Sequence, residues 1–130
     1  MRIYLVRHAE AAPGEPDHQR RLTPEGREQA RQVGERLAEA EPRPEAVLHS
    51  PLVRAGETAA LIAAPLGIAP EPHDRLAPGA TAAGIRAAVT GRGQAVVVVG
   101  HQPDCGQIAA ELTGGPEPPF PAGGMAVIEL

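Results

Sequence analysis

A stretch of five consecutive apolar residues, Ala95 to Val99, constrains the fold of this 130-residue chain more than any other feature. A strand that is apolar at every position, and not only at alternate positions, has to be buried on both of its faces. Such strands are typical of parallel sheets that carry helices on both sides. The stretch therefore predicts an α/β protein with this strand in the interior of its sheet.

The remainder of the chain alternates between strand and helix patterns, as an α/β fold requires. Short apolar runs predict strands at residues 2–6, 46–48, 95–99 and 125–129. Helical spacing and helix-start signals predict helices at residues 24–40, 51–66, 81–89 and 104–112. We therefore expect a single domain over residues 1–130, built as a three-layer sandwich with a mostly parallel central sheet and helices on both faces.

Two pairs of a hydroxyl residue and a proline mark where helices begin. Thr23-Pro24 and Ser50-Pro51 each place a hydroxyl at the N-cap position and a proline at the first helical position. Gly67 is expected to end the second helix, because glycine readily takes the left-handed conformation found after helices. Between these elements, the polar segment 9–21 is predicted to be an irregular loop, and the proline-rich segment 68–80 is predicted to be a connector with one extended stretch.

Composition narrows the class of protein and its location. The net charge is −4, and the twelve basic residues, all arginine, are spread along the chain, so we expect no nucleic-acid surface. No apolar run is long enough to span a membrane, and the first residues lack a signal-peptide pattern. The single cysteine, Cys105, cannot form an internal disulfide, which agrees with a reducing compartment. These features favour a cytoplasmic protein that does not bind membranes.

Four cationic side chains stand just beyond three of the predicted strands: Arg7, His8, Arg54 and His101. Because ligands of such sheets bind at the carboxyl ends of the strands, these side chains are expected to meet. Guanidinium groups match phosphate oxygens in pairs, and an imidazole can act as a nucleophile or a proton carrier. The set therefore predicts a site for phosphoryl transfer that needs neither a metal nor a cofactor.

Motifs at these positions resemble those of the histidine phosphatase superfamily, which has the phosphoglycerate mutase-like fold. Leu5 to Glu10 resembles the Arg-His-Gly-Glu motif, and Ser50 to Thr58 resembles Ser-Pro-x-x-Arg-Ala-x-x-Thr. Gly100-His101 resembles the third motif, a late Gly-His at a strand end. The stretch from Asp17 to Gly26 is similar to the Asp-x-x-Arg-x-Leu-Thr-x-x-Gly stretch of the small SixA-type phosphohistidine phosphatases. In order and spacing, the resemblance extends over nearly the whole chain.

The resemblance implies a role for each of these side chains. His8 would attack phosphorus and carry the phosphoryl group as phosphohistidine, from which water would release phosphate. Arg7, Arg54 and His101 would hold the phosphoryl oxygens and stabilise charge in the transition state. Arg20 would help to bind the substrate.

Two departures from the superfamily pattern bear on the substrate. Ala9 replaces the usual glycine, a small change that the site should tolerate. Residues 73–78 carry no glutamate where many members have a general acid, although Asp74 lies in this segment. An imidazole leaves phosphorus more readily than an alkoxide, so the missing acid favours phosphohistidine as the substrate. The short connections also predict an open, shallow pocket, which suits a phosphate group displayed on a protein.

Other interpretations of the same residues stay open. The chain fits a phosphomonoesterase for a small metabolite as well, so the expected partner is a phosphorylated protein or a small phosphate ester. A phosphate-binding module without turnover would keep the same cations, whereas a mutase would need a general acid and a closed pocket. The remaining histidines, His18, His49 and His73, are expected in loops or on the surface, and Cys105 is expected to be packed at the start of its helix.

Overall fold

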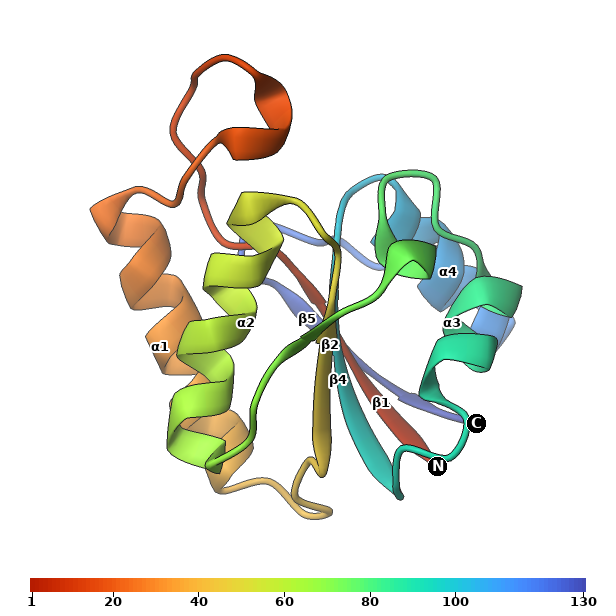
Figure 1. Ribbon diagram of the computed structural model, residues 1–130. Coiled ribbons are helices and arrows are strands. Elements are labelled where there is room, and N and C mark those ends of the chain that lie inside the picture. The colour runs from red at the N-terminus through yellow and green to blue at the C-terminus, as the bar shows by residue number, and fades with distance from the viewer.

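The valine-rich strand predicted from the sequence lies at the centre of the sheet (Figure 1). In the computed structural model, which describes residues 1–130, this strand is β4 (Ala95–Gly100), and all of its residues are buried. It pairs in parallel with β1 (Arg2–Arg7) on one side and with β2 (Ala46–His49) on the other. Its side chains alternate between two hydrophobic clusters on opposite faces of the sheet, which explains why the strand contains no polar residue.

Two further strands complete the sheet, in the order β3-β2-β4-β1-β5. β3 (Glu71–Pro72) is a two-residue strand, parallel to β2, in the connector where one extended stretch was predicted. β5 (Met125–Glu129) has the predicted bounds and runs antiparallel to β1. The mostly parallel sheet is therefore confirmed, with the antiparallel pairing confined to one edge.

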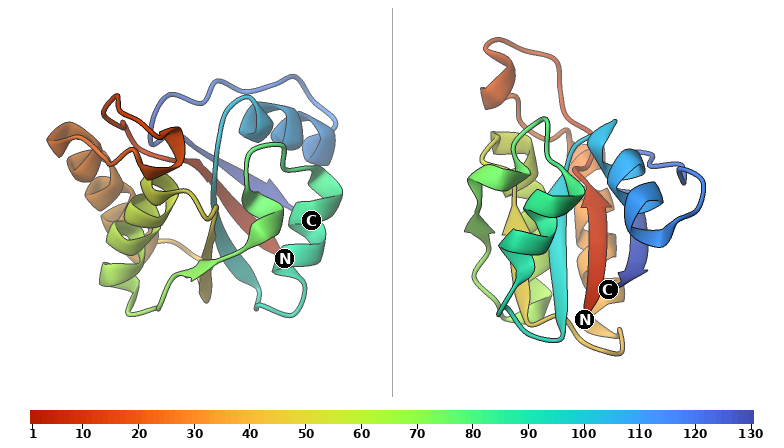
Figure 2. Two further views of the ribbon diagram at one scale, coloured as in Figure 1. Left: turned by 45° about the horizontal axis from the view of Figure 1, so that its top comes forward. Right: turned by 90° about the vertical axis from the view of Figure 1, so that its right-hand side faces the viewer.

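Helices cover both faces of the sheet, which confirms the three-layer α/β architecture. α1 (Pro24–Ala38) and α2 (Val53–Leu66) pack against each other on one face. α3 (Ala82–Val89) and α4 (Asp104–Thr113) lie on the other face (Figures 1 and 2). None of these helices has both the length and the apolar character needed to cross a membrane. The carboxyl ends of β1, β2 and β4 point to one edge of the sheet, at the top of Figure 1.

The two predicted hydroxyl N-caps have different outcomes. Thr23 caps α1 as predicted, because its side chain accepts a hydrogen bond from a backbone N–H of the first turn. The prediction for Ser50 is wrong, because α2 begins only at Val53 and has no side-chain cap. The hydroxyl of Ser50 contacts His101 instead, so it belongs to the candidate site. α1 ends at Ala38, two residues before the predicted end.

Two long connections flank the carboxyl edge of the sheet (Figure 1). The segment 9–21 rises above the helices between β1 and α1 and contains one 3₁₀ helix, η1 (Asp17–Gln19). The segment 68–80 follows Gly67, which ends α2 in the left-handed conformation as predicted, with φ 69°. It contains a second 3₁₀ helix, η2 (Asp74–Leu76). Both connections are therefore placed to border a site at the strand ends.

Candidate active site

His8 follows the last residue of β1, where the chain leaves the sheet. Its backbone N–H donates to the Gly100 carbonyl oxygen at 3.0 Å, which extends the pairing with β4 by one residue. Its ring Nδ1 lies 2.8 Å from the carbonyl oxygen of Ala9. Because a carbonyl oxygen can only accept, Nδ1 carries the proton of the neutral ring and Nε2 carries the free lone pair. The ring is thus held in the form that nucleophilic attack through Nε2 requires.

The surroundings of His8 keep its ring uncharged. Burial lowers the pKa of His8 below its ordinary value. The charges of Arg54, Arg7 and Arg20 lower this pKa further, against the opposing effect of the Ala9 carbonyl. A neutral ring retains its lone pair, so at neutral pH the imidazole can attack phosphorus.

Of the three guanidinium groups that affect the pKa of His8, those of Arg54 and Arg7 come from the start of α2 and the end of β1. Arg54, at the start of α2, has a side chain that is only 9% exposed and donates through Nη1 to the Asp17 carbonyl oxygen at 2.9 Å. Its Nη2 lies 3.2 Å from Asp17 Oδ2. Arg7, at the end of β1, donates through Nη1 to the carbonyl oxygen of Phe120 at 2.9 Å. In both arginines Nε is buried and has no hydrogen-bond partner in the protein.

His101 lies directly beyond β4, and its ring centroid is 5.2 Å from that of His8. The residue is buried, with Nε2 2.7 Å from Ser50 Oγ, while Nδ1 is buried without a partner. Burial lowers the pKa of His101 to about 4, and the charges of His8 and Arg54 act in the same direction. When Ser50 donates its hydroxyl hydrogen to Nε2, the proton of this neutral ring sits on Nδ1 and makes Nδ1 a donor.

Three buried side-chain nitrogens lack a hydrogen-bond partner: Arg7 Nε, Arg54 Nε and His101 Nδ1. A buried polar group without a partner costs about 1–3 kcal/mol, so such groups are rare in folded proteins. All three belong to the set of four residues predicted from the strand ends. A tetrahedral oxyanion has the acceptors that these N–H groups lack, so the arrangement is that of an anion site.

Thr58 joins the two motifs that carry His8 and Arg54. Its buried hydroxyl accepts a hydrogen bond from the Ala9 backbone N–H at 3.0 Å and donates to the Arg54 carbonyl oxygen at 2.8 Å. This one side chain thereby ties the turn after β1 to the first turn of α2. Thr58 belongs to the Ser-Pro-x-x-Arg-Ala-x-x-Thr motif, but the motif does not predict this role, because its two partners are brought together only by the fold.

Arg20 lies at the rim of the site, on the connection between β1 and α1. Its Nε donates to the Ala12 carbonyl oxygen at 2.8 Å, and its Nη1 lies 3.0 Å from Asp17 Oδ1. Asp17 therefore links Arg20 to Arg54. Glu57 fastens the same connection to α2, since its Oε1 accepts from the Leu22 backbone N–H at 2.8 Å. The spacing of Asp17 and Arg20 was noticed in the sequence, but the contact between Asp17 and Arg54 was not predicted.

The other histidines and the cysteine lie outside this group. His18 is exposed on η1, and the backbone N–H of Arg75 donates to His73 Nδ1 at the start of η2. His49, at the end of β2, is partly buried, and its Nδ1 lies 2.8 Å from the Ser50 carbonyl oxygen. Cys105 is packed in the core as predicted, and burial raises its pKa to about 12, so it stays a thiol.

One edge of the sheet thus carries an imidazole, two guanidinium groups and N–H donors that lack partners. An α/β protein with this set of groups is suited to phosphoryl chemistry. Residues 3–78, more than half of the chain, match the family described as the histidine phosphatase superfamily (branch 1). The chain therefore belongs to this superfamily, as its motifs predicted, and is a phosphatase.

Relatives and solved structures place the chain within this superfamily more closely. An uncharacterized protein from Picosynechococcus sp. is 36% identical over 123 residues, which cover 88% of this chain and 74% of the relative. The protein histidine phosphatase SixA in complex with tungstate has a TM-score of 0.89 and 28% identity, over 100% of this chain and 88% of that chain. A putative SixA from Agrobacterium tumefaciens has a TM-score of 0.82 and 29% identity, over 97% and 88%. These similarities support the SixA-type branch and the phosphoglycerate mutase-like fold.

Proposed function

We propose that this protein is a metal-independent phosphohistidine phosphatase that removes the phosphoryl group from a histidine of a protein. The observation that carries the proposal is the ring of His8, neutral and with Nε2 free, beside three N–H donors without partners. The positive charge that phosphoryl transfer requires is supplied by arginine side chains. The binding of tungstate, also a tetrahedral oxyanion, to the structurally similar SixA agrees with such a site.

In the first step, the lone pair of His8 Nε2 forms a bond to phosphorus while the bond from phosphorus to the substrate's ring nitrogen breaks. The bonding pair stays on that nitrogen, and the substrate imidazole leaves. Arg7, Arg54 and His101 hold the phosphoryl oxygens through the donors that lack partners. His8 keeps its proton on Nδ1, and the hydrogen bond from this N–H to the Ala9 carbonyl oxygen stabilises the phosphorylated ring.

In the second step, a water oxygen forms a bond to phosphorus as the bond to His8 Nε2 breaks. The bonding pair returns to Nε2, and the released inorganic phosphate keeps the oxygen of the attacking water. One water proton ends on the phosphate or in solvent, so His8 regains its initial neutral form. The same donors stabilise the transition states of both steps, because the phosphoryl oxygens stay in one place.

Phosphohistidine is the proposed substrate because its leaving group depends little on a general acid. Residues 73–78 contain no glutamate, and Asp74 on η2 is exposed. An alkoxide leaving group would need a proton from such an acid, whereas an imidazole protonated on its other nitrogen leaves as a neutral molecule. The proposal therefore predicts faster turnover of phosphohistidine than of alkyl phosphates.

The test compares turnover of a phosphohistidine peptide, an alkyl phosphate and an aryl phosphate by wild type, His8→Ala and His18→Ala. We expect phosphohistidine to be hydrolysed fastest, acid-labile phosphate to be trapped on wild-type protein, and both signals to disappear in His8→Ala. His18→Ala, which removes an exposed histidine, should behave as wild type. Faster turnover of the esters would indicate a phosphomonoesterase, and the lack of any turnover would indicate a phosphate-binding module.

A further inference from the structure

We propose that Asp17 makes the enzyme selective for phosphohistidine by accepting a hydrogen bond from the N–H of the imidazole ring as that ring leaves. The inference rests on the proposed function and assigns a substrate contact to a side chain outside the set of Arg7, His8, Arg54 and His101. Asp17 lies on η1, in the connection that rises over the carboxyl edge of the sheet (Figure 1). Its Oδ2 is 3.2 Å from Arg54 Nη2, and its Oδ1 is 3.0 Å from Arg20 Nη1.

The carboxylate of Asp17 lies on the solvent side of the anion site. Its side chain is 65% exposed, whereas that of Arg54, to which it is bound, is 9% exposed. In an in-line displacement the leaving group lies opposite the nucleophile. His8 attacks from the strand end, so the leaving group has to face outward, on the side where Asp17 lies.

The charge of Asp17 is available for this contact. The hydrogen bond from Arg20 lowers the pKa of Asp17, and Arg54 adds to this effect, so the group is an anion at neutral pH. Each carboxylate oxygen has one arginine contact in the structure and can accept a second hydrogen bond. The charge of Asp17 also raises the pKa of His101, against the larger effect of burial, so the carboxylate lies within electrostatic reach of that ring.

A carboxylate at this position distinguishes the two kinds of leaving group. The ring of phosphohistidine carries a proton on the nitrogen that is not bonded to phosphorus, and this N–H donates to Asp17. When the bond between phosphorus and nitrogen breaks, the bonding pair stays on the ring, which leaves as neutral imidazole with that proton. An ester leaves as an oxygen anion, which has no donor for Asp17 and is repelled by its charge. Asp17 therefore speeds the first reaction and slows the second.

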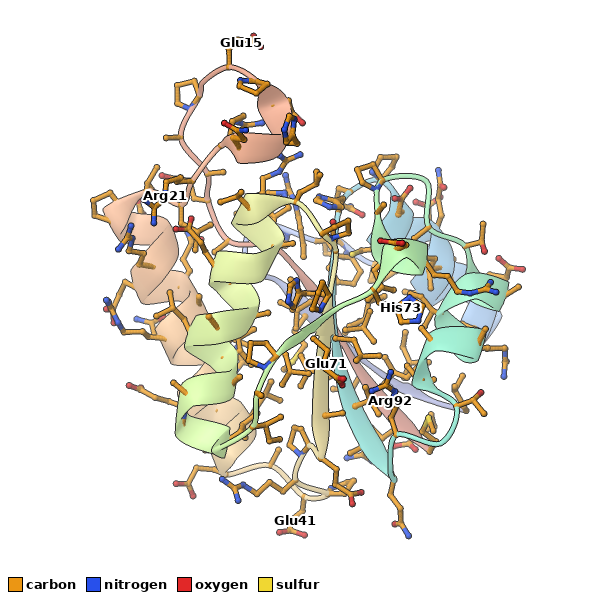
Figure 3. All side chains as sticks on the ribbon, in the orientation of Figure 1. Glu15, Arg21, Glu41, Glu71, His73 and Arg92 are labelled. Atoms are coloured by element: carbon orange, nitrogen blue, oxygen red, sulfur yellow. The ribbon has the colours of Figure 1, made fainter.

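Asp17→Asn tests the inference, because it removes the charge while keeping the size and one amide oxygen for Arg54. We expect kcat/KM for a phosphohistidine peptide to fall about tenfold, the amount typical for a lost charge-assisted hydrogen bond, while kcat/KM for an alkyl phosphate stays equal or rises. Asp17→Glu should restore part of the preference. Glu15→Gln is the matched control, since Glu15 lies at the outer tip of the same connection and points away from the body of the molecule (Figure 3).

Other outcomes would overturn either the role of Asp17 or the proposed function. A parallel loss with both substrates in Asp17→Asn would mean that Asp17 only positions Arg54, and unchanged kinetics would mean that it has no role in turnover. Either result overturns the inference while the proposed function stands. A wild-type enzyme that hydrolyses the alkyl phosphate but not phosphohistidine would overturn the proposed function, and the role of Asp17 together with it.

Discussion

The two histidines of the site differ in which ring nitrogen is left without a partner in the protein. His8 binds the Ala9 carbonyl through Nδ1 and leaves Nε2 free, whereas His101 faces Ser50 through Nε2 and leaves Nδ1 free. Burial lowers the pKa of both rings, so both are neutral at neutral pH. One ring can therefore attack phosphorus, while the other donates a hydrogen bond to a phosphoryl oxygen.

The first prediction concerns the protonation of these rings. We expect His101 to titrate at about pH 4, far below the ordinary histidine value of 6.5, and His8 to titrate below its ordinary value. Nitrogen-15 NMR of the ring nitrogens across this range measures both. Saturating inorganic phosphate should raise both pKa values, because a bound anion stabilises the imidazolium forms. A His101 ring that titrates near 6.5 would contradict the burial that the structure gives it.

The same lowered pKa values set the direction of the stability change with pH. Below pH 6.5 a histidine of the unfolded chain takes up a proton, while His101 in the folded chain stays neutral until about pH 4. The unfolded state then binds more protons, so the free energy of unfolding should fall as the pH drops through this window. Urea unfolding at several pH values measures the fall, which should be smaller in His101→Asn.

Ser50→Ala tests the orientation of His101. The variant removes the hydroxyl that contacts His101 Nε2 and accepts from the Leu52 backbone N–H, so a buried ring nitrogen and a partly buried N–H lose this partner. We expect the free energy of unfolding to fall by about 1–3 kcal/mol, and kcat/KM to fall because Nδ1 is no longer fixed as a donor. Thr90→Ala is the control, since its exposed hydroxyl binds only the Arg86 carbonyl oxygen in α3. Unchanged kinetics in Ser50→Ala would show that His101 does not need this contact.

At the scale of elements, α1 packs closely against the turn that follows His8. The Thr23 backbone N–H donates to the Glu10 carbonyl oxygen at 3.0 Å. Gly26, in the first turn of α1, lies so close to the same carbonyl that a Cβ atom there would be 2.1 Å from its oxygen. The glycine of the Asp-x-x-Arg-x-Leu-Thr-x-x-Gly stretch is therefore required for steric reasons, because only a residue without a side chain lets α1 approach the backbone at Glu10 this closely.

Gly26→Ala should therefore destabilise the protein and disturb the site. The added methyl group has to displace backbone, so we expect a loss of about 1–3 kcal/mol in the free energy of unfolding. A lower kcat/KM should accompany it, because Glu10 is two residues from His8. Urea unfolding and steady-state kinetics measure the two effects. Gly115→Ala, where the nearest atom is the Thr113 side-chain oxygen at 3.6 Å, should change neither, and equal effects in both variants would argue against this docking.

The positions of the helices and strands also explain which residues of the site could be predicted from the sequence and which could not. Arg7, His8 and His101 could be predicted, because they stand at the carboxyl ends of β1 and β4, and these two parallel strands end at one edge of the sheet. The role of Ser50 could not, since Ser-Pro equally marks a helix start and its partner His101 lies 51 residues further along the chain. Likewise, the contact of Asp17 with Arg54 spans 37 residues and depends on how an irregular connection folds back over α2. Local patterns carry no information about such contacts.

At the scale of the whole molecule, the anion site joins elements that are far apart in the sequence. Its three donors without partners come from β1, from α2 and from the residue after β4. Only the folded chain brings them together, so an oxyanion has to bind the native state in preference to the unfolded state. The cost of burying these donors unpaired lowers the stability of the free protein, and a bound oxyanion relieves it.

Inorganic phosphate should therefore raise the stability of the whole domain. At a concentration of about 100 times its Kd, a ligand that binds only the native state adds about 2.7 kcal/mol to the free energy of unfolding. Thermal unfolding in phosphate, against chloride of equal ionic strength, measures the effect. Arg54→Gln should reduce it strongly, whereas Arg36→Gln on α1, a residue without an ion-pair partner, should leave it intact. An equal rise in chloride would mean that general screening of charge, and not occupation of the site, stabilises the fold. A rise in stability with phosphate alone, lost in Arg54→Gln, would show that an oxyanion bound in the site pairs these donors. The free-energy cost of burying them unpaired would then be borne only by the protein without a ligand.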